Sequence, residues 1–191
     1  MDPVLAVIQE VEQECRDRRI PMLGREKARF LAELVRKSRP RLVVECGTAI
    51  GYSALWIART LRDLGRGRLI TIEIDPKRSE EARGHLERAG LLSYVELWSG
   101  DACELVSRIQ EPVDFVHLDN GYGNYYPCFR ALEPRLVEEA VIVADNVGIG
   151  AEAMQDYLDY VRKHYPSETY WFTVNLPWVR RDAMEVTVYR K

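Results

Sequence analysis

The segment 43–53 constrains the fold more than any other part of the chain. It reads as a short apolar strand that carries Glu45 near its end, followed by a turn with two glycines and then at once by a helix. The apolar segments 70–73 and 115–119 also end in an acidic residue, and 141–146 ends in Asp-Asn. Because the carboxyl ends of parallel strands meet at one edge of a sheet, we expect these polar side chains to converge there, in a pocket of the nucleotide-binding type.

Strand-type and helix-type patterns alternate along most of the chain. The apolar spacing predicts helices at 3–18, 24–38, 52–64, 77–89, 102–110, 125–136 and 150–164, and strands at 41–46, 68–74, 93–98, 113–119 and 139–145. This alternation is typical of an α/β, doubly wound, mainly parallel sheet. Two last strand-type segments, 169–174 and 183–189, are joined only by 175–182, which is too short for a parallel crossover and therefore predicts an antiparallel hairpin. We expect one domain over 1–191, with 1–38 as amino-terminal helices.

Composition excludes several classes of protein. With 47% hydrophobic and 30% charged residues, the 191-residue chain has the balance of a soluble globular domain. A net charge of -3 argues against a broadly electropositive nucleic-acid binder. The four cysteines form no Cys-x-x-Cys pair, so neither a zinc knuckle nor a redox dithiol is expected. The amino terminus lacks the basic start and long apolar run of a signal peptide, which predicts a cytoplasmic protein without membrane segments.

The turn after the first strand has the chemistry of a ligand site. Gly47 and Gly51 would let the backbone pass close to a ligand, and Glu45 could accept hydrogen bonds from hydroxyls or an ammonium group. The Gly-x-x-x-Gly spacing lacks the middle glycine of a dinucleotide fingerprint, and a tight turn without a ligand is the alternative. Glu73 follows at about 20 residues, where an acid binds a ribose diol in this architecture, although a solvated strand end would look the same. Asp101 could cap the next helix, accept from an adenine amino group, or do both.

Taken together, the segments 43–56, 70–76, 99–102, 114–119 and 140–146 resemble the successive motifs of S-adenosylmethionine-dependent methyltransferases. More narrowly, they resemble the cation-dependent O-methyltransferases of the catechol and caffeoyl-CoA type, from about Leu23 to the carboxyl end. The resemblance implies a Rossmann-like class I methyltransferase fold, whose seven-stranded, mainly parallel sheet has an antiparallel last strand. That expectation agrees with the hairpin predicted from the tail.

The resemblance also implies the cofactor contacts. Glu45 and Ser53 would receive the methionine part of S-adenosylmethionine, Glu73 the ribose, and Asp101 with Ala102 the adenine. The full set of cofactor-binding residues implied in this way is Leu23, Glu45, Gly47, Ala49, Gly51, Tyr52, Ser53, Glu73, Ile74, Gly100, Asp101, Ala102 and Asp119.

A divalent cation is implied as well, held by Asp119, Asp145 and Asn146. Two carboxylates and an amide are oxygen donors of the kind that Mg²⁺ prefers. For Asp145 and Asn146, a turn after a buried strand is the alternative.

The chain departs from the family where a candidate general base is expected. Family members commonly carry a lysine three residues after the first metal aspartate, and here that position is Tyr122. We take Asp119 and Tyr122 as catalytic candidates, but a tyrosine with an ordinary pKa of about 10 is a poor base, and Tyr122 could equally be a stacking wall for a flat substrate. His117 reads as a buried core residue rather than a catalyst.

These patterns predict an S-adenosylmethionine-dependent O-methyltransferase that acts on a hydroxyl of a small, aromatic or catechol-like acceptor, with a divalent cation orienting that acceptor. A homodimer is expected only from the family resemblance. Three alternatives stay open: a transfer-RNA wobble hydroxyuridine methyltransferase, a non-catalytic S-adenosylmethionine-binding protein, which the missing lysine motivates, and a nicotinamide oxidoreductase.

Overall fold

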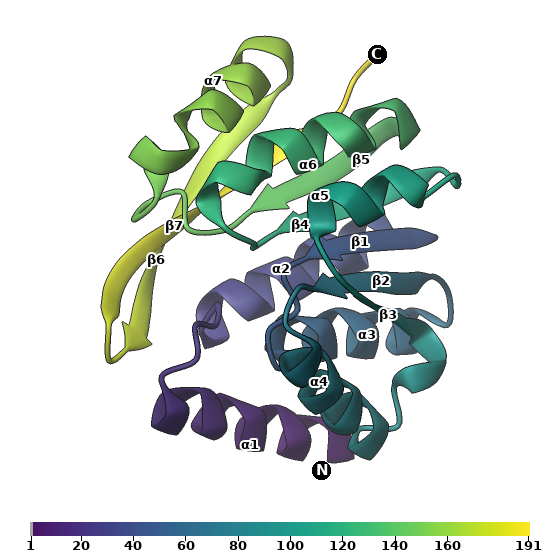
Figure 1. Cartoon of the computed structure of the whole chain (residues 1–191), viewed down its shortest axis with the longest axis vertical. Coiled ribbons are helices and arrows are strands. Elements are labelled where there is room, and N and C mark those ends of the chain that lie inside the picture. Colours follow the sequence, from purple (N-terminus) through teal and green to yellow (C-terminus); the bar gives the residue numbers. More distant parts are fainter. Residues whose placement is uncertain (1) are drawn as a thin grey trace.

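One seven-stranded sheet with the order β3-β2-β1-β4-β5-β7-β6 runs through the molecule (Figure 1). The computed structural model describes residues 2–191. Strands β1 to β5 pair in parallel, β7 pairs antiparallel with β5, and β6 pairs antiparallel with β7. The α/β fold class and the antiparallel end of the sheet are therefore confirmed. The strands are β1 (Leu42–Cys46), β2 (Arg68–Glu73), β3 (Val95–Ser99), β4 (Val113–Leu118), β5 (Leu136–Ala144), β6 (Ser167–Leu176) and β7 (Val179–Val188).

Helices cover both faces of the sheet, as Figure 1 shows, with α1 to α4 on one side and α5 to α7 on the other. They are α1 (Pro3–Arg18), α2 (Arg25–Ser38), α3 (Tyr52–Leu64), α4 (Pro76–Arg88), α5 (Ala102–Leu105), α6 (Tyr125–Leu132) and α7 (Gln155–His164). Each face buries its own apolar cluster, so the central strands are covered on both sides. This explains why β1 reads as a continuous apolar run rather than an alternating one.

Some predicted boundaries are wrong. The helices expected at 102–110, 125–136 and 150–164 are shorter, because their outer turns are 3₁₀ segments, at 106–108, 133–135 and 151–154. The loop expected at 175–182 is also much shorter, since β6 and β7 continue almost to Pro177 and Trp178. The hairpin's outer half is exposed on alternate residues, so its polar residues resembled a loop although the backbone is paired.

Candidate active site

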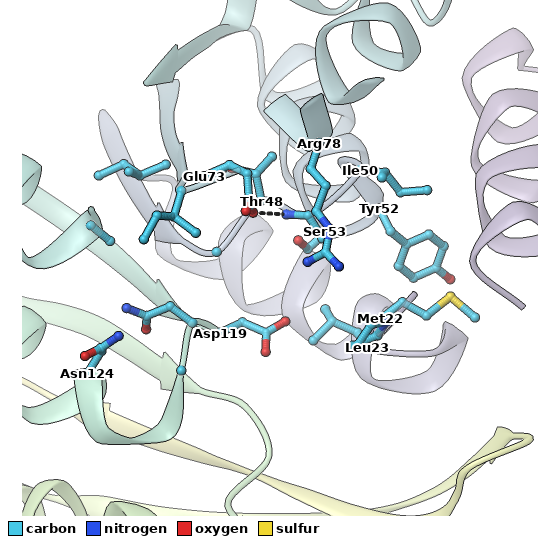
Figure 2. A pocket seen from close by; sticks show the side chains of 18 of the residues that line it. Met22, Leu23, Thr48, Ile50, Tyr52, Ser53, Glu73, Arg78, Asp119 and Asn124 are labelled. Atoms are coloured by element: carbon cyan, nitrogen blue, oxygen red, sulfur yellow. Dashed lines mark hydrogen bonds between the residues drawn. The ribbon is translucent and has the colours of Figure 1, made fainter. Parts of the chain in front are cut away.

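A cavity of about 370 Å³ lies at the carboxyl ends of β1 to β4. In open α/β sheets this edge is where ligands bind, and the volume suits a small ligand or cofactor. Figure 2 shows Glu73, the last residue of β2, and Asp119, which follows β4, at this cavity, with Leu23 pointing toward Asp119 from the segment before α2. All but two of the predicted cofactor residues line the cavity: Leu23, Gly47, Ala49, Tyr52, Ser53, Glu73, Ile74, Gly100, Asp101, Ala102 and Asp119.

Gly47 forms the floor of this cavity, and its lack of a side chain is required there. Its φ is +99°, and a Cβ built on it would lie 2.2 Å from the backbone oxygen of Asp119. The turn after β1 and the end of β4 therefore touch through bare backbone, which is a role that only glycine fills.

Gly51 is one of the two predicted residues that do not line the cavity. It precedes α3 with φ +95°, and a Cβ there would meet Ala82 of α4 at 3.2 Å. A side chain at Gly51 would therefore crowd the start of α3 against α4, and a cofactor contact of Gly51 stays a prediction.

Glu45 is the other, and its carboxylate lies inside the protein. The residue belongs to β1, is fully buried, and accepts a hydrogen bond from Thr71 Oγ1 at 2.6 Å on one oxygen. The other oxygen lies 3.0 Å from Nδ1 of His117, which is also fully buried. The contact of Glu45 with the methionine part of the cofactor stays a prediction. His117 is a core residue, as the sequence indicated.

Glu73 shapes the turn that borders the cavity. Its Oε2 accepts from the backbone amide of Ala49 at 2.7 Å, and its Oε1 accepts from the amide of Asp75 at 3.0 Å. Ala49 has a left-handed backbone with φ +47°, which costs free energy in an alanine and is fixed here by a charge-assisted hydrogen bond. Glu73 therefore holds the cavity's rim in shape while its side chain also lines the cavity.

Asp101 caps a helix and lines the cavity at the same time. Its Oδ1 accepts from the amides of Cys103 at 2.8 Å and Glu104 at 3.2 Å, at the start of α5. The capping role predicted from the sequence is confirmed.

A second cavity of about 150 Å³ adjoins the first, and it contains the predicted cation ligands. Asp119 follows β4, and Asp145 and Asn146 follow β5; all three side chains line this space. The two cavities share Pro21, Met22, Asp119, Tyr122 and Asn146, so they meet at one wall. Apolar side chains of the β6–β7 hairpin and its surroundings form the remaining wall: Ile149, Val174, Leu176, Trp178 and Val179.

The acidic groups of the second cavity repel one another. Burial raises the pKa of Asp119 well above its ordinary value, and the charge of Asp145 raises it further, although Lys27 offsets part of the effect. Burial also raises the pKa of Tyr122, and the carboxylates of Asp182, Asp119 and Asp145 add to the increase. A raised pKa keeps the phenol protonated, which is unfavourable for a general base and compatible with a stacking wall.

Sequence reasoning missed the basic residue of this cavity, Lys27 of α2. Its side chain is only 2% exposed, and its Nζ donates to Asp145 Oδ1 at 2.6 Å and to Asp182 Oδ2 at 2.7 Å. Burial alone would lower the pKa of Lys27, but the two carboxylates outweigh burial and raise it. One signal was available, since Lys27 lies one helical turn before the buried Leu31 and therefore on the apolar face of its helix.

Other cavity residues carried no motif of their own in the sequence. The cofactor-side lining also includes Met22, Thr48, Ile50, Arg78, Asn120 and Asn124. Among residues 2–191, no group of three histidine, cysteine or acidic residues could hold a metal, so a site in the second cavity would depend on the amide of Asn146. Within the same residues, no helix is both long and apolar enough to cross a membrane.

Comparison with known proteins agrees with this geometry. A family model described as a methyltransferase domain matches residues 44–147. Catechol O-methyltransferase B of Danio rerio is 33% identical, over 96% of this chain and 72% of that enzyme. Catechol O-methyltransferase of Mycobacterium tuberculosis is also 33% identical, over 84% of this chain and 73% of that enzyme.

The fold is shared with solved O-methyltransferases. The structure of TomG from Streptomyces achromogenes in complex with S-adenosylmethionine superposes with a TM-score of 0.84, at 22% identity, over 97% of this chain and 90% of that one. The chain therefore belongs to the S-adenosylmethionine-dependent O-methyltransferases, and it is an enzyme of the catechol O-methyltransferase type.

Proposed function

We propose that this enzyme transfers the methyl group of S-adenosylmethionine to a hydroxyl of a small hydroxylated aromatic compound, with a divalent cation orienting the acceptor. The observation that carries the proposal is the wall shared by the two cavities, where Asp119, Asn146 and Met22 belong to both. A cofactor in the larger cavity and an acceptor in the smaller one would meet at that wall. Sequence relatives named catechol O-methyltransferase support an acceptor of the catechol type.

The residues of the second cavity fit a divalent cation. Asp119, Asp145 and Asn146 supply oxygen donors, the type of ligand that Mg²⁺ binds. With its acids ionised, the cavity holds three carboxylates and the Lys27 ammonium, which leaves two negative charges uncompensated. One divalent cation would neutralise that charge and offset the repulsion from Asp145, which adds to the effect of burial on the pKa of Asp119. When bound, such an ion lowers the pKa of an acceptor hydroxyl and fixes its direction.

The protein's own contribution to methyl transfer is alignment and exclusion of water. In an in-line displacement the acceptor oxygen must approach the methyl carbon from the side opposite the sulfur, so a fixed relative position of the two reactants accelerates the reaction. The rim held by Glu73 would fix the cofactor. The apolar wall that includes Trp178 would hold an aromatic ring and keep water from the reacting atoms.

The proton of the acceptor hydroxyl has no lysine to receive it at position 122. Tyr122 lies in both cavities, and its raised pKa makes it a better wall than base. We therefore propose that Tyr122 contacts the acceptor ring, and that acidification of the hydroxyl does not depend on this side chain. Homodimerisation and a cytoplasmic location stay predictions.

The test is methyl transfer from S-adenosylmethionine to a panel of catechols and simple phenols, with Mg²⁺ or with a chelator. We expect product with Mg²⁺, loss of product with the chelator, and recovery when Mg²⁺ is restored. Asp119→Asn should abolish the response to Mg²⁺. Asp114→Asn is the matched control, because Asp114 lies on β4, the strand that Asp119 follows, but accepts hydrogen bonds from the backbone amides of Arg41 and Leu42 at its far end.

Two outcomes would overturn parts of the proposal. Methylation that continues unchanged in the presence of the chelator would show that the reaction needs no divalent cation. Methylation of transfer RNA, with none of any catechol or phenol, would replace the small aromatic acceptor with an RNA substrate.

A further inference from the structure

Asp182, near the start of β7, lines the same cavity as the proposed cation ligands and is itself only 1% exposed. Its carboxylate accepts four hydrogen bonds. Oδ2 accepts from Lys27 Nζ at 2.7 Å and from Asn146 Nδ2 at 3.0 Å, whereas Oδ1 accepts from the backbone amides of Gly148 at 3.1 Å and Ile149 at 3.0 Å. All four partners are N–H groups that can only donate, so both oxygens of Asp182 act as acceptors.

An acceptor that cannot donate decides which way the amide of Asn146 points. An asparagine side chain has one donor end and one acceptor end, and an ionised carboxylate can pair only with the donor end. When Nδ2 is directed at Asp182, Oδ1, which is bonded to the same carbon of the planar amide, points in a different direction. The side chain of Asn146 lines both cavities. The backbone of Asn146 is left-handed with φ +60°, which also fixes where its side chain starts.

Lys27 extends the same arrangement to Asp145. Its ammonium bridges Asp182 Oδ2 and Asp145 Oδ1, so the carboxylate of Asp145 is held by one oxygen while Oδ2 is the oxygen left for a cation. Lys27 lies on α2, Asp145 directly follows β5, and Asp182 lies on β7. Each of these side chains is at most 2% exposed. One buried ammonium and one buried carboxylate thus orient two of the three proposed ligands.

We propose that Asp182 is a positioning residue for the cation site: it presents Oδ1 of Asn146 to the cation and, through Lys27, fixes Asp145. This inference rests on the proposed function, because it assumes that Asn146 and Asp145 bind a divalent cation. The three proposed ligands therefore depend on other residues for their orientation, and the β6–β7 hairpin, far along the chain, supplies one of these residues. Groups behind metal ligands commonly act in this way.

The test measures Mg²⁺ binding to the full chain by titration calorimetry in the presence of S-adenosylhomocysteine, so it does not depend on turnover. In Asp182→Asn one end of the side chain becomes an NH₂ group that faces donors. Turned toward Asn146, it pairs only if the Asn146 amide flips; turned toward Gly148 and Ile149, it loses both backbone hydrogen bonds. We expect Mg²⁺ affinity to fall by about 10-fold or more, the usual effect of losing such a partner.

A second background separates orientation from charge. In the Asn146→Ala variant, Asp182 can act on the site only through Lys27 and Asp145, so adding Asp182→Asn should weaken Mg²⁺ binding by less than it does in the wild type. A role through charge alone would give the same factor in both backgrounds, because the distance from Asp182 to the cation is unchanged. Equal factors would therefore overturn the proposal.

Asp182→Glu serves as a second variant, since it keeps the negative charge but displaces the carboxylate by one methylene. Weakened Mg²⁺ binding in Asp182→Glu supports positioning, whereas wild-type affinity overturns it. Unchanged S-adenosylhomocysteine affinity shows that each variant is folded. If the wild type itself binds no Mg²⁺, the cation part of the proposed function fails together with this inference; if the wild type and both Asp182 variants bind Mg²⁺ equally, only this inference fails.

Discussion

Adding one carbon atom at Gly47 tests whether the contact between the β1–α3 turn and the end of β4 shapes the active site. In Gly47→Ala the new Cβ would lie 2.2 Å from the backbone oxygen of Asp119, whereas ordinary contacts begin at 3.4 Å. The two backbone segments would have to separate by about 1 Å, and an alanine at φ +99° is itself strained. Asp119 would move relative to the remaining cavity residues.

The expected effect on function is larger than the effect on folding. A displacement of 1 Å between reacting groups costs about 100-fold in rate, which corresponds to about 2.7 kcal/mol. The left-handed backbone should cost a further 1–3 kcal/mol of stability, roughly. We therefore expect Gly47→Ala to reduce kcat/KM by about 100-fold or more, and to weaken S-adenosylhomocysteine binding.

Gly65→Ala provides the matched control. Gly65 also has a positive φ, +64°, but apart from Gly65 itself and its two chain neighbours, no atom of residues 2–191 lies within 4 Å of its would-be Cβ. This variant should lose about 1 kcal/mol of stability from the left-handed backbone alone, or about 3 °C in Tm, with normal cofactor affinity and kcat/KM. The measurements are calorimetry with S-adenosylhomocysteine, steady-state kinetics and thermal unfolding. If Gly47→Ala bound cofactor and turned over like the wild type, or if Gly65→Ala lost as much activity, the proposed close approach would not matter.

Three further predictions concern single side chains. Asp119→Asn should raise Tm in the presence of a chelator, because it removes a carboxylate whose pKa is raised by burial and by Asp145. The folded state favours the protonated acid, so the loss of stability caused by ionised Asp119 grows as pH rises above the pKa of the unfolded state. A Tm difference from wild type that is no larger at pH 8 than at pH 5 would contradict this. Glu73→Gln should weaken S-adenosylhomocysteine binding by about 10- to 100-fold, because the charged hydrogen bonds to the amides of Ala49 and Asp75 at the cavity rim are lost. Calorimetry measures this, and unchanged affinity would contradict the role of Glu73 in shaping the rim. Trp178→Ala should raise the KM of an aromatic acceptor and leave cofactor affinity unchanged, which kinetics with a catechol would check. A change in cofactor affinity alone would contradict a role of Trp178 in acceptor binding.

The strand-to-helix alternation and the acids at strand ends could be recognised without coordinates. Both follow from local physics, because apolar periodicity reports burial, and parallel strands must direct their carboxyl ends to a common edge. That is why Asp119, Asp145 and Asn146 were expected together and do line one cavity. The same reasoning placed Glu73 and Asp101 at the cofactor cavity.

Glu45 shows where such reasoning stops. Its position near a strand end could be seen in the sequence, but its hydrogen-bond partners could not: Thr71 and His117 are its neighbours on the adjacent strands. Which oxygen meets which partner depends on the register between strands, and one sequence does not specify that register.

The sequence by itself determined the class of fold and the polar residues that reach the active edge of the sheet, because these depend on periodicity and on residue type. The tertiary structure alone decided how those residues are held. Lys27 is 118 residues from Asp145 and 155 residues from Asp182, yet one ammonium joins both carboxylates in the interior. Such a contact arises only when α2 packs on the sheet whose end the β6–β7 hairpin forms, since no local pattern in the chain encodes a pairing between segments so far apart.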